Sequence, residues 1–92
     1  MIHEERNKLS EKTLDVKRAI DSIKEELEAV DWYNQRADAT SDEELKRILI
    51  HNANEEKEHA AMLIEWLRKN DEVFAKELQD NLYKEKANTD HE

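Results

Sequence analysis

The chain has no cysteine, no glycine and no proline among its 92 residues, and each absence excludes a class of structure. Without cysteine there is no disulfide bond, no thiolate nucleophile and no cysteine-ligated zinc or iron–sulfur site. Without glycine there is no glycine-rich phosphate loop and no Asn-Gly or Asp-Gly hairpin turn. Because glycine and proline also interrupt helices, their absence favours long helices over sheets.

Hydrophobic and basic residues are scarce as well. Only nineteen residues are Leu, Ile, Val or Phe, close to the roughly 20% below which chains tend to be disordered. We therefore expect one domain at most, which completes its core with a second copy of itself. The net charge of −9 disfavours nucleic acids and anionic membranes as partners. The sequence has no membrane-length apolar run and no signal-peptide pattern, so we expect a cytoplasmic protein.

The apolar residues recur in alternating steps of four and three, which predicts amphipathic helices and an all-α fold. We expect helices at residues 10–36 and 41–69, a short helix at 71–83 and a flexible tail at 84–92. Ser10 is expected to cap the first helix, and Ser41 the second in a capping box with Glu44. The short helix is expected to bury Phe74, Leu78 and Leu82.

The loop between the long helices is so short that they must form an antiparallel hairpin, which is half of a four-helix bundle. A two-fold dimer would supply the other half. In the first helix the apolar seam consists of Val16, Ile20, Ile23, Leu27 and Val30. Ile50 and Ile64 lie off the seam of the second helix, which hints at assembly beyond a dimer.

The corresponding seam of the second helix has a carboxylate and an imidazole at its centre. Its members are Leu45, Leu49, Asn52, Glu56, His59, Leu63 and Trp66. Burying an ionised carboxylate without a partner costs several kcal/mol, and a bound metal ion would offset that cost. Glu26 lies at the edge of the first helix's seam near mid-length, where the hairpin brings it towards Glu56 and His59. Asn52 is interpreted as a register-setting or hydrogen-bonding residue, and His51 as solvent-exposed.

Doubling these three residues by a two-fold axis gives the ligand set of a di-iron carboxylate site. That set is one Glu from each of two helices and Glu-x-x-His from each of the other two. Carboxylates can bridge two ions, and an oxygen-rich site with one histidine per ion favours iron or manganese. Ca, Zn or Mn are expected to substitute for iron. Alternatively, Glu56 and His59 match Glu-x-x-H by chance among 24 acidic residues and 4 histidines, and Glu26 is a coiled-coil flanking charge.

Two further groups lie beside this site on the first helix. Tyr33 follows Glu26 by seven residues and could donate a hydrogen bond to its carboxylate; ordinary aromatic packing of Trp32 and Tyr33 is the alternative. Glu25 and Glu28 form, with Asp31, an acidic edge that could guide cations inward, whereas a solvated helix face is the default interpretation of such a run.

The residues that carry a resemblance lie in two blocks. They are residues 25–33 (EELEAVDWY) on the first helix and, on the second, residues 51–52 (HN), 55–62 (EEKEHAAM) and 65–68 (EWLR). From about Ser10 to Leu82 the sequence resembles the encapsulated ferritins, which are cargo proteins of encapsulin shells.

The resemblance implies a two-helix protomer with a ferroxidase centre at the dimer interface. It also implies a ring-shaped decamer without a storage cavity, inside an encapsulin nanocompartment that stores the iron mineral. By the matching positions, Glu26, Glu56 and His59 would be the di-iron ligands. Tyr33 would support Glu26, Trp32 would lie near the site, and Glu25 and Glu28 would form an outer metal-access site. A C-terminal shell-targeting peptide rich in Gly and Leu is usual in this family, and none is visible in residues 88–92.

Three classes of function follow from these observations. The preferred one is a ferroxidase that oxidises Fe(II) with O2. The second is a module that holds iron or manganese without turnover, and the third is a structural helical dimerisation unit. Oxygen consumption on addition of Fe(II) distinguishes the first from the second. The structural unit predicts that no metal-dependent change in oligomerisation occurs.

Overall fold

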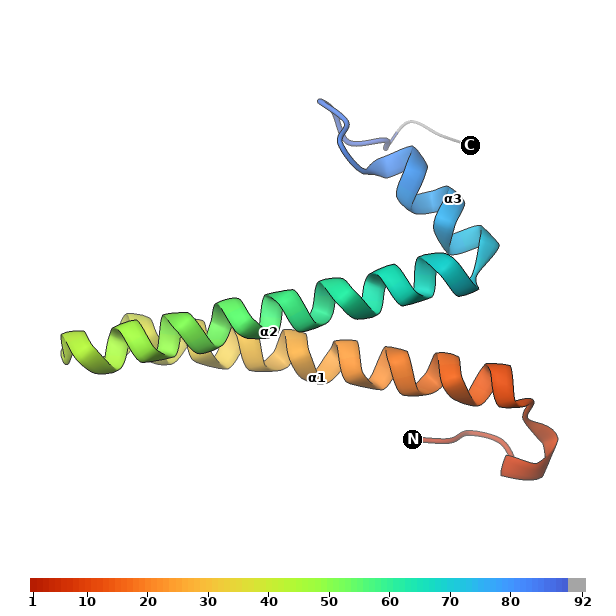
Figure 1. Ribbon diagram of the computed structural model, residues 1–92, viewed down its shortest axis with the longest axis horizontal. Helices are drawn as coiled ribbons and strands as arrows, with labels where there is room; N and C mark the ends of the chain where they lie inside the picture. Colours follow the sequence, from red (N-terminus) through yellow and green to blue (C-terminus); the bar gives the residue numbers. More distant parts are fainter. Residues whose placement is uncertain (90–92) are drawn as a thin grey trace.

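The computed structural model describes residues 1–89, and over these residues it contains helices and connecting turns but no strand. A short 3-10 turn, η1 (Arg6–Lys8), precedes three helices, α1 (Glu11–Ala39), α2 (Glu43–Asn70) and α3 (Glu72–Asn81). The two long helices form an antiparallel hairpin, and α3 departs from the end of α2 on the side away from α1 (Figure 1). The prediction of an all-α hairpin with a short third helix is confirmed.

Each helix has an N-cap residue whose side chain accepts a hydrogen bond from a backbone N–H of the first turn. Ser10 Oγ accepts from the Thr13 N–H at 3.0 Å, as the sequence predicts. Asp71 Oδ1 accepts from the Phe74 N–H at 2.9 Å. The predicted Ser41 cap of α2 is wrong, because Asp42 Oδ1 accepts from the Leu45 N–H at 2.8 Å. The carboxylate is the better choice there, since the helix N-terminus attracts negative charge.

The ends of the helices differ from the predicted ones by one to three residues. α1 continues to Ala39 rather than ending at Arg36, because Ala37 is buried against the hairpin and holds a further turn in place. α3 ends at Asn81, and Tyr83 follows it with a φ of 59°. Glycine usually adopts this left-handed conformation at a helix end, but the chain contains no glycine, and Tyr83 adopts it instead. Residues 84–89 are not helical, and the rest of the predicted tail, residues 90–92, lies outside the described residues.

The contact between α1 and α2 is made mainly of small side chains. The buried hydrophobic residues of the described chain are Leu14, Ala19, Ala37, Ala53, Ala60 and Leu67. The predicted apolar seam of α1 is rotated about one position from this contact, so that Ile20 is 44% and Leu27 52% exposed. Because alanines let the helices pack closely, the larger hydrophobic side chains are left on the edges and outer faces of the hairpin.

This arrangement leaves the isolated chain elongated and short of a core. Its radius of gyration is 17.2 Å, whereas a compact domain of this length has a radius of about 12 Å. α3 contacts α2 alone within the described residues, and the prediction that it buries Phe74 and Leu82 is wrong, because both are exposed; Leu78 is half-buried. A single hairpin offers α3 no second surface to pack against.

The segment before α1 folds back along that helix. In Figure 1 the N-terminal residues run beside α1 rather than away from it. Met1 lines shallow hollows with residues of α1 that include Val16, Ile20 and Lys17. No helix among residues 1–89 combines the length and the apolar character needed to cross a membrane.

Candidate metal centre

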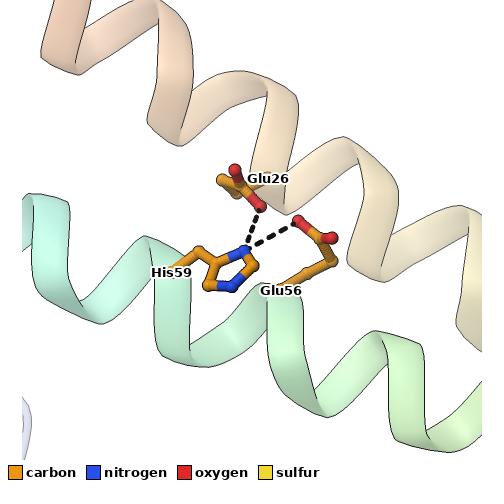
Figure 2. Close-up of side chains that lie close together, drawn as sticks. All are labelled: Glu26, Glu56 and His59. Carbon is orange, nitrogen blue, oxygen red and sulfur yellow. Dashed lines mark ion pairs between the residues drawn. The ribbon is translucent and has the colours of Figure 1, made fainter.

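Near the middle of the hairpin, one side chain of α1 and two of α2 meet (Figure 2). His59 Nδ1 lies 3.4 Å from Glu26 Oε2 and 3.6 Å from Glu56 Oε2. Glu56 and His59 are three residues apart and therefore project from one side of α2. Glu26 faces them because antiparallel helices of nearly equal length bring their midpoints together. The nearest donor atoms of all three residues lie within 4.8 Å of one another.

The three side chains are neither fully buried nor freely solvated. The side chains of Glu26 and Glu56 are each 24% exposed, and that of His59 is 43% exposed. Glu26 Oε2 is itself buried, yet it has no hydrogen-bond partner among the described residues. A carboxylate oxygen removed from water without a hydrogen bond is costly, and such groups need an explanation.

A metal ion fits this arrangement better than a proton or a hydrogen-bond donor does. Two carboxylates and an imidazole are donors that iron and manganese accept, and zinc or calcium can use the same oxygens. The buried Glu26 oxygen lies 3.4 Å from His59 Nδ1 and close to the Glu56 carboxylate, and it accepts no hydrogen bond among the described residues. One chain supplies two negative charges and three donor side chains, which is fewer donors than an octahedral ion uses.

A groove beside the cluster was not anticipated from the sequence. It is lined on α1 by Asp15, Arg18, Ala19 and Ser22, and on α2 by Leu63 and Trp66. Ser22 lies one turn before Glu26 and Leu63 one turn after His59, so the groove adjoins the cluster. The small side chains of Ala19 and Ser22 are the signal in the sequence that could have located it.

The other predicted site residues lie farther out. Glu25 and Glu28 are exposed and line a hollow on the outside of α1 together with Asp21, Lys24 and Met1. Lys24 places a positive charge in the same hollow, so the acidic edge is partly neutralised. Among the described residues, the group of converging donor atoms contains Glu26, Glu56 and His59 but neither Glu25 nor Glu28.

Trp32 and Tyr33, the aromatic residues near the end of α1, both lie close to an arginine. The guanidinium carbon of Arg36 lies 5.8 Å from the ring centroids of both Trp32 and Tyr33. Tyr33 is half-buried and Trp32 is 48% exposed. Within the described part of the chain no hydrogen bond joins Tyr33 to Glu26, so its role as a support for that carboxylate stays a prediction.

Comparison with known families decides the relationship of the chain. The model of the EncFtn-like family matches residues 1–85. The chain belongs to the EncFtn-like family. A curated relative, the encapsulated ferritin-like protein of Rhodospirillum rubrum, is 57% identical over 83 residues, which are 90% of this chain and 59% of the relative. A ferritin-like protein of Thermotoga maritima is 48% identical over 90 residues, 98% of this chain and 79% of that protein.

Two further proteins are similar to this chain over different lengths. The encapsulin nanocompartment cargo protein EncC of Myxococcus xanthus is 42% identical over 50 residues, 54% of this chain and 38% of that protein. The crystal structure of protein ne0167 from Nitrosomonas europaea superposes with a TM-score of 0.91 at 56% identity, covering 96% of this chain and 97% of that one. The EncFtn-like chain thus spans about three fifths of the Rhodospirillum protein and nearly all of the Nitrosomonas chain.

Proposed function

We propose that the chain is a ferroxidase, which oxidises Fe(II) to Fe(III) with O2 at a di-iron site shared by two copies of the chain. The observation that carries this proposal is the buried Glu26 oxygen that accepts no hydrogen bond and lies beside His59 and Glu56. Membership of the EncFtn-like family and the name of the Rhodospirillum relative support it. In this reaction iron is the substrate, and O2 accepts one electron from each Fe(II).

Each residue of the cluster has a distinct part in this proposal. Glu26 and Glu56 bind Fe(II) through oxygen and compensate its charge. Because carboxylates attract Fe(III) more strongly than Fe(II), they also favour the loss of the electron. His59 supplies a nitrogen donor from the side that faces both carboxylates, and α1 and α2 hold the three donors in place before the metal arrives.

A second copy of the chain is proposed because one hairpin is incomplete. Large hydrophobic side chains are exposed on both long helices, among them Ile48 and Met62 on α2. A two-fold partner covering the face that carries His59 would double the donor set to the six side chains typical of di-iron carboxylate proteins. Ile20, Leu27 and Ile50 offer further apolar surface for assembly beyond the dimer, in line with the decamer that the family resemblance implies.

We further propose that the assembly works inside an encapsulin shell and supplies it with ferric iron for storage. The name of the Myxococcus relative, an encapsulin nanocompartment cargo protein, supports this location. Residues Glu25 and Glu28 would collect cations at the outer hollow, and Trp32 and Tyr33 would flank the centre.

The deciding experiment is an anaerobic titration with Fe(II), followed by air, with the ferric absorbance recorded per chain. Saturation near one iron per chain with rapid oxidation supports the ferroxidase. Iron that binds without accelerated oxidation would instead make the chain a metal-holding module. If no iron binds, the structural dimerisation unit is the better description.

A further inference from the structure

Near the end of α1, the guanidinium group of Arg36 lies close to the aromatic rings of Trp32 and Tyr33. Arg36 follows Trp32 by four residues and Tyr33 by three, and its guanidinium carbon is 5.8 Å from both ring centroids. These distances fall within the roughly 6 Å over which an aromatic ring attracts a cation. The helical repeat explains the geometry, since residues three and four apart lie on the same side of a helix. The Arg36 guanidinium therefore forms a cation–π contact with both rings.

The rings are the partners of this side chain. Among residues 1–89, Arg36 forms no ion pair with a carboxylate, so its charge is not neutralised by direct contact. Its backbone carbonyl accepts the Thr40 N–H at 3.1 Å, which closes the helix and does not involve the guanidinium. No cation–π pair is found for Trp66 or Tyr83 in the described part of the chain. Residues 1–89 thus contain aromatic rings with and without a cation–π contact.

Aromatic rings close to an iron and oxygen reaction are exposed to oxidants. Tyr33 lies seven residues after Glu26, about 10 Å along the helix. Two Fe(II) ions give one electron each to O2, which takes up two protons and becomes hydrogen peroxide. A further Fe(II) gives one electron to peroxide, whose O–O bond breaks to yield hydroxide and a hydroxyl radical. That radical removes one electron from a ring and becomes hydroxide, and the ring cation then loses its indole or phenol proton. The neutral ring radical left behind combines with O2, which adds oxygen to the ring.

We infer that Arg36 protects Trp32 and Tyr33 against this one-electron oxidation, because its guanidinium lies 5.8 Å from both rings on the helix that also carries Glu26. Loss of an electron leaves a positive charge on the ring, and a fixed positive charge 5.8 Å away opposes it. The inference rests on the proposed ferroxidase function, which supplies the oxidant. Its consequence is that the chain survives repeated turnover with both aromatic residues intact.

The first test compares the unmodified full-length chain with Arg36→Gln and Arg36→Lys. Each is given the same number of Fe(II) and O2 turnovers, and oxygen addition at Trp32 and Tyr33 is measured by peptide mass spectrometry per iron oxidised. Arg36→Gln should raise the yield about threefold or more, and Arg36→Lys, which keeps the charge, should restore most of the protection. Trp66 serves as an internal control whose yield stays constant.

Two results would overturn the inference in this test. Equal yields in the unmodified chain and Arg36→Gln would show that the guanidinium gives no protection. Equal increases in Arg36→Gln and Arg36→Lys would show that lost ring packing, and not lost charge, exposes the rings. Since Arg36 is exposed, both variants should keep the helical circular dichroism of the unmodified chain.

The second test needs no iron and so separates this inference from the proposed function. Iron-free protein is treated with azide radicals, a one-electron oxidant that attacks aromatic rings, and modification of Trp32 is compared with that of Trp66. The ratio should rise about threefold in Arg36→Gln. An unchanged ratio contradicts the protection. A chain that fails to oxidise iron would refute the ferroxidase and leave this ratio as an independent result.

Discussion

Helix α2 carries two histidines beside carboxylates, and their surroundings differ more than their distances do. His51 Nε2 lies 3.6 Å from Glu55 Oε1 on the same helix, and its side chain is 70% exposed. His59 Nδ1 lies 3.4 Å from Glu26 across the hairpin and 3.6 Å from Glu56. The distances alone would make the two sites equivalent. Burial and the second helix distinguish them.

The comparison shows which features make a metal site plausible in so acidic a chain. The side chains of His51 and Glu55 are both exposed, and an exposed ion pair of this kind contributes little to stability. At His59, a second carboxylate arrives from another helix and one of its oxygens has lost water without gaining a hydrogen bond. The cost of that desolvation is what a bound cation would offset.

The largest expected difference between the two histidines is in iron oxidation. His59→Ala should lower the initial rate of ferric absorbance at least tenfold, because removal of even an outer support of a metal ligand costs about 10- to 100-fold. His51→Ala is the matched control, a histidine on the same helix beside a carboxylate at a similar distance, and it should retain the rate. If His59→Ala oxidised Fe(II) as fast as the unmodified chain, the assignment of the cluster would be wrong.

Metal should stabilise the assembled chain through the His59 cluster and not through His51. Mn(II), which stays divalent in air better than Fe(II), should raise the melting temperature and the fraction of dimer or larger assembly. A ligand at 100 times its dissociation constant adds about 2.7 kcal/mol. Glu26→Gln should lose this response and Glu55→Gln should keep it, as followed by thermal unfolding and sedimentation. An assembly that persists unchanged after complete chelation would refute metal-driven assembly.

Without metal, the partly buried Glu26 carboxylate should lower the stability of the folded chain. Glu26→Gln removes the charge from the buried oxygen and should stabilise the metal-free chain by about 1 kcal/mol. The exposed Glu55→Gln should change stability little. Urea unfolding in the presence of a chelator measures both. A destabilised Glu26→Gln chain would mean that the carboxylate already has a favourable partner without metal.

The sequence predicted the parts of the fold that depend on local patterns. The absence of glycine and proline and the four–three repeat predict long helices, and the short loop between them predicts the hairpin. Ser10 is predicted as a cap because its hydroxyl precedes a helical pattern. The predicted seams also brought Glu26, Glu56 and His59 to one place, where the structure finds their donor atoms within 4.8 Å. Their role as iron ligands stays a prediction.

The sequence is less informative where several partners compete for one apolar side chain. A heptad pattern does not say whether Ile20 and Leu27 face the other helix of the hairpin or another copy, and in the structure they are largely exposed. The same ambiguity made Phe74 and Leu82 look like core residues. Ser41 and Asp42 are adjacent and both suited to capping, so local preference could not choose between them.

The smallest expected effect concerns Lys17 and Asp21, a half-buried ion pair within α1, and tests whether it resembles the exposed pair His51–Glu55. Lys17 Nζ lies 2.8 Å from Asp21 Oδ2, and this hydrogen bond holds the pKa of Asp21 below its ordinary value of 3.8. A carboxyl whose pKa is lowered on folding adds stability above its unfolded pKa and loses that contribution as the pH falls through the folded value.

Asp21→Asn should therefore be slightly less stable than the unmodified chain at about pH 6, and the difference should shrink as the pH falls towards about 2 and Asp21 becomes protonated. Urea midpoints of the two chains at both pH values measure it, with Glu55→Gln, a change within the exposed pair, as the comparison. A difference that grew on acidification would mean that Asp21 is stabilised in its protonated form. A large difference at about pH 6 would mean that an ion pair within one helix can matter as much as the His59 cluster, which would undo the contrast between the two histidines.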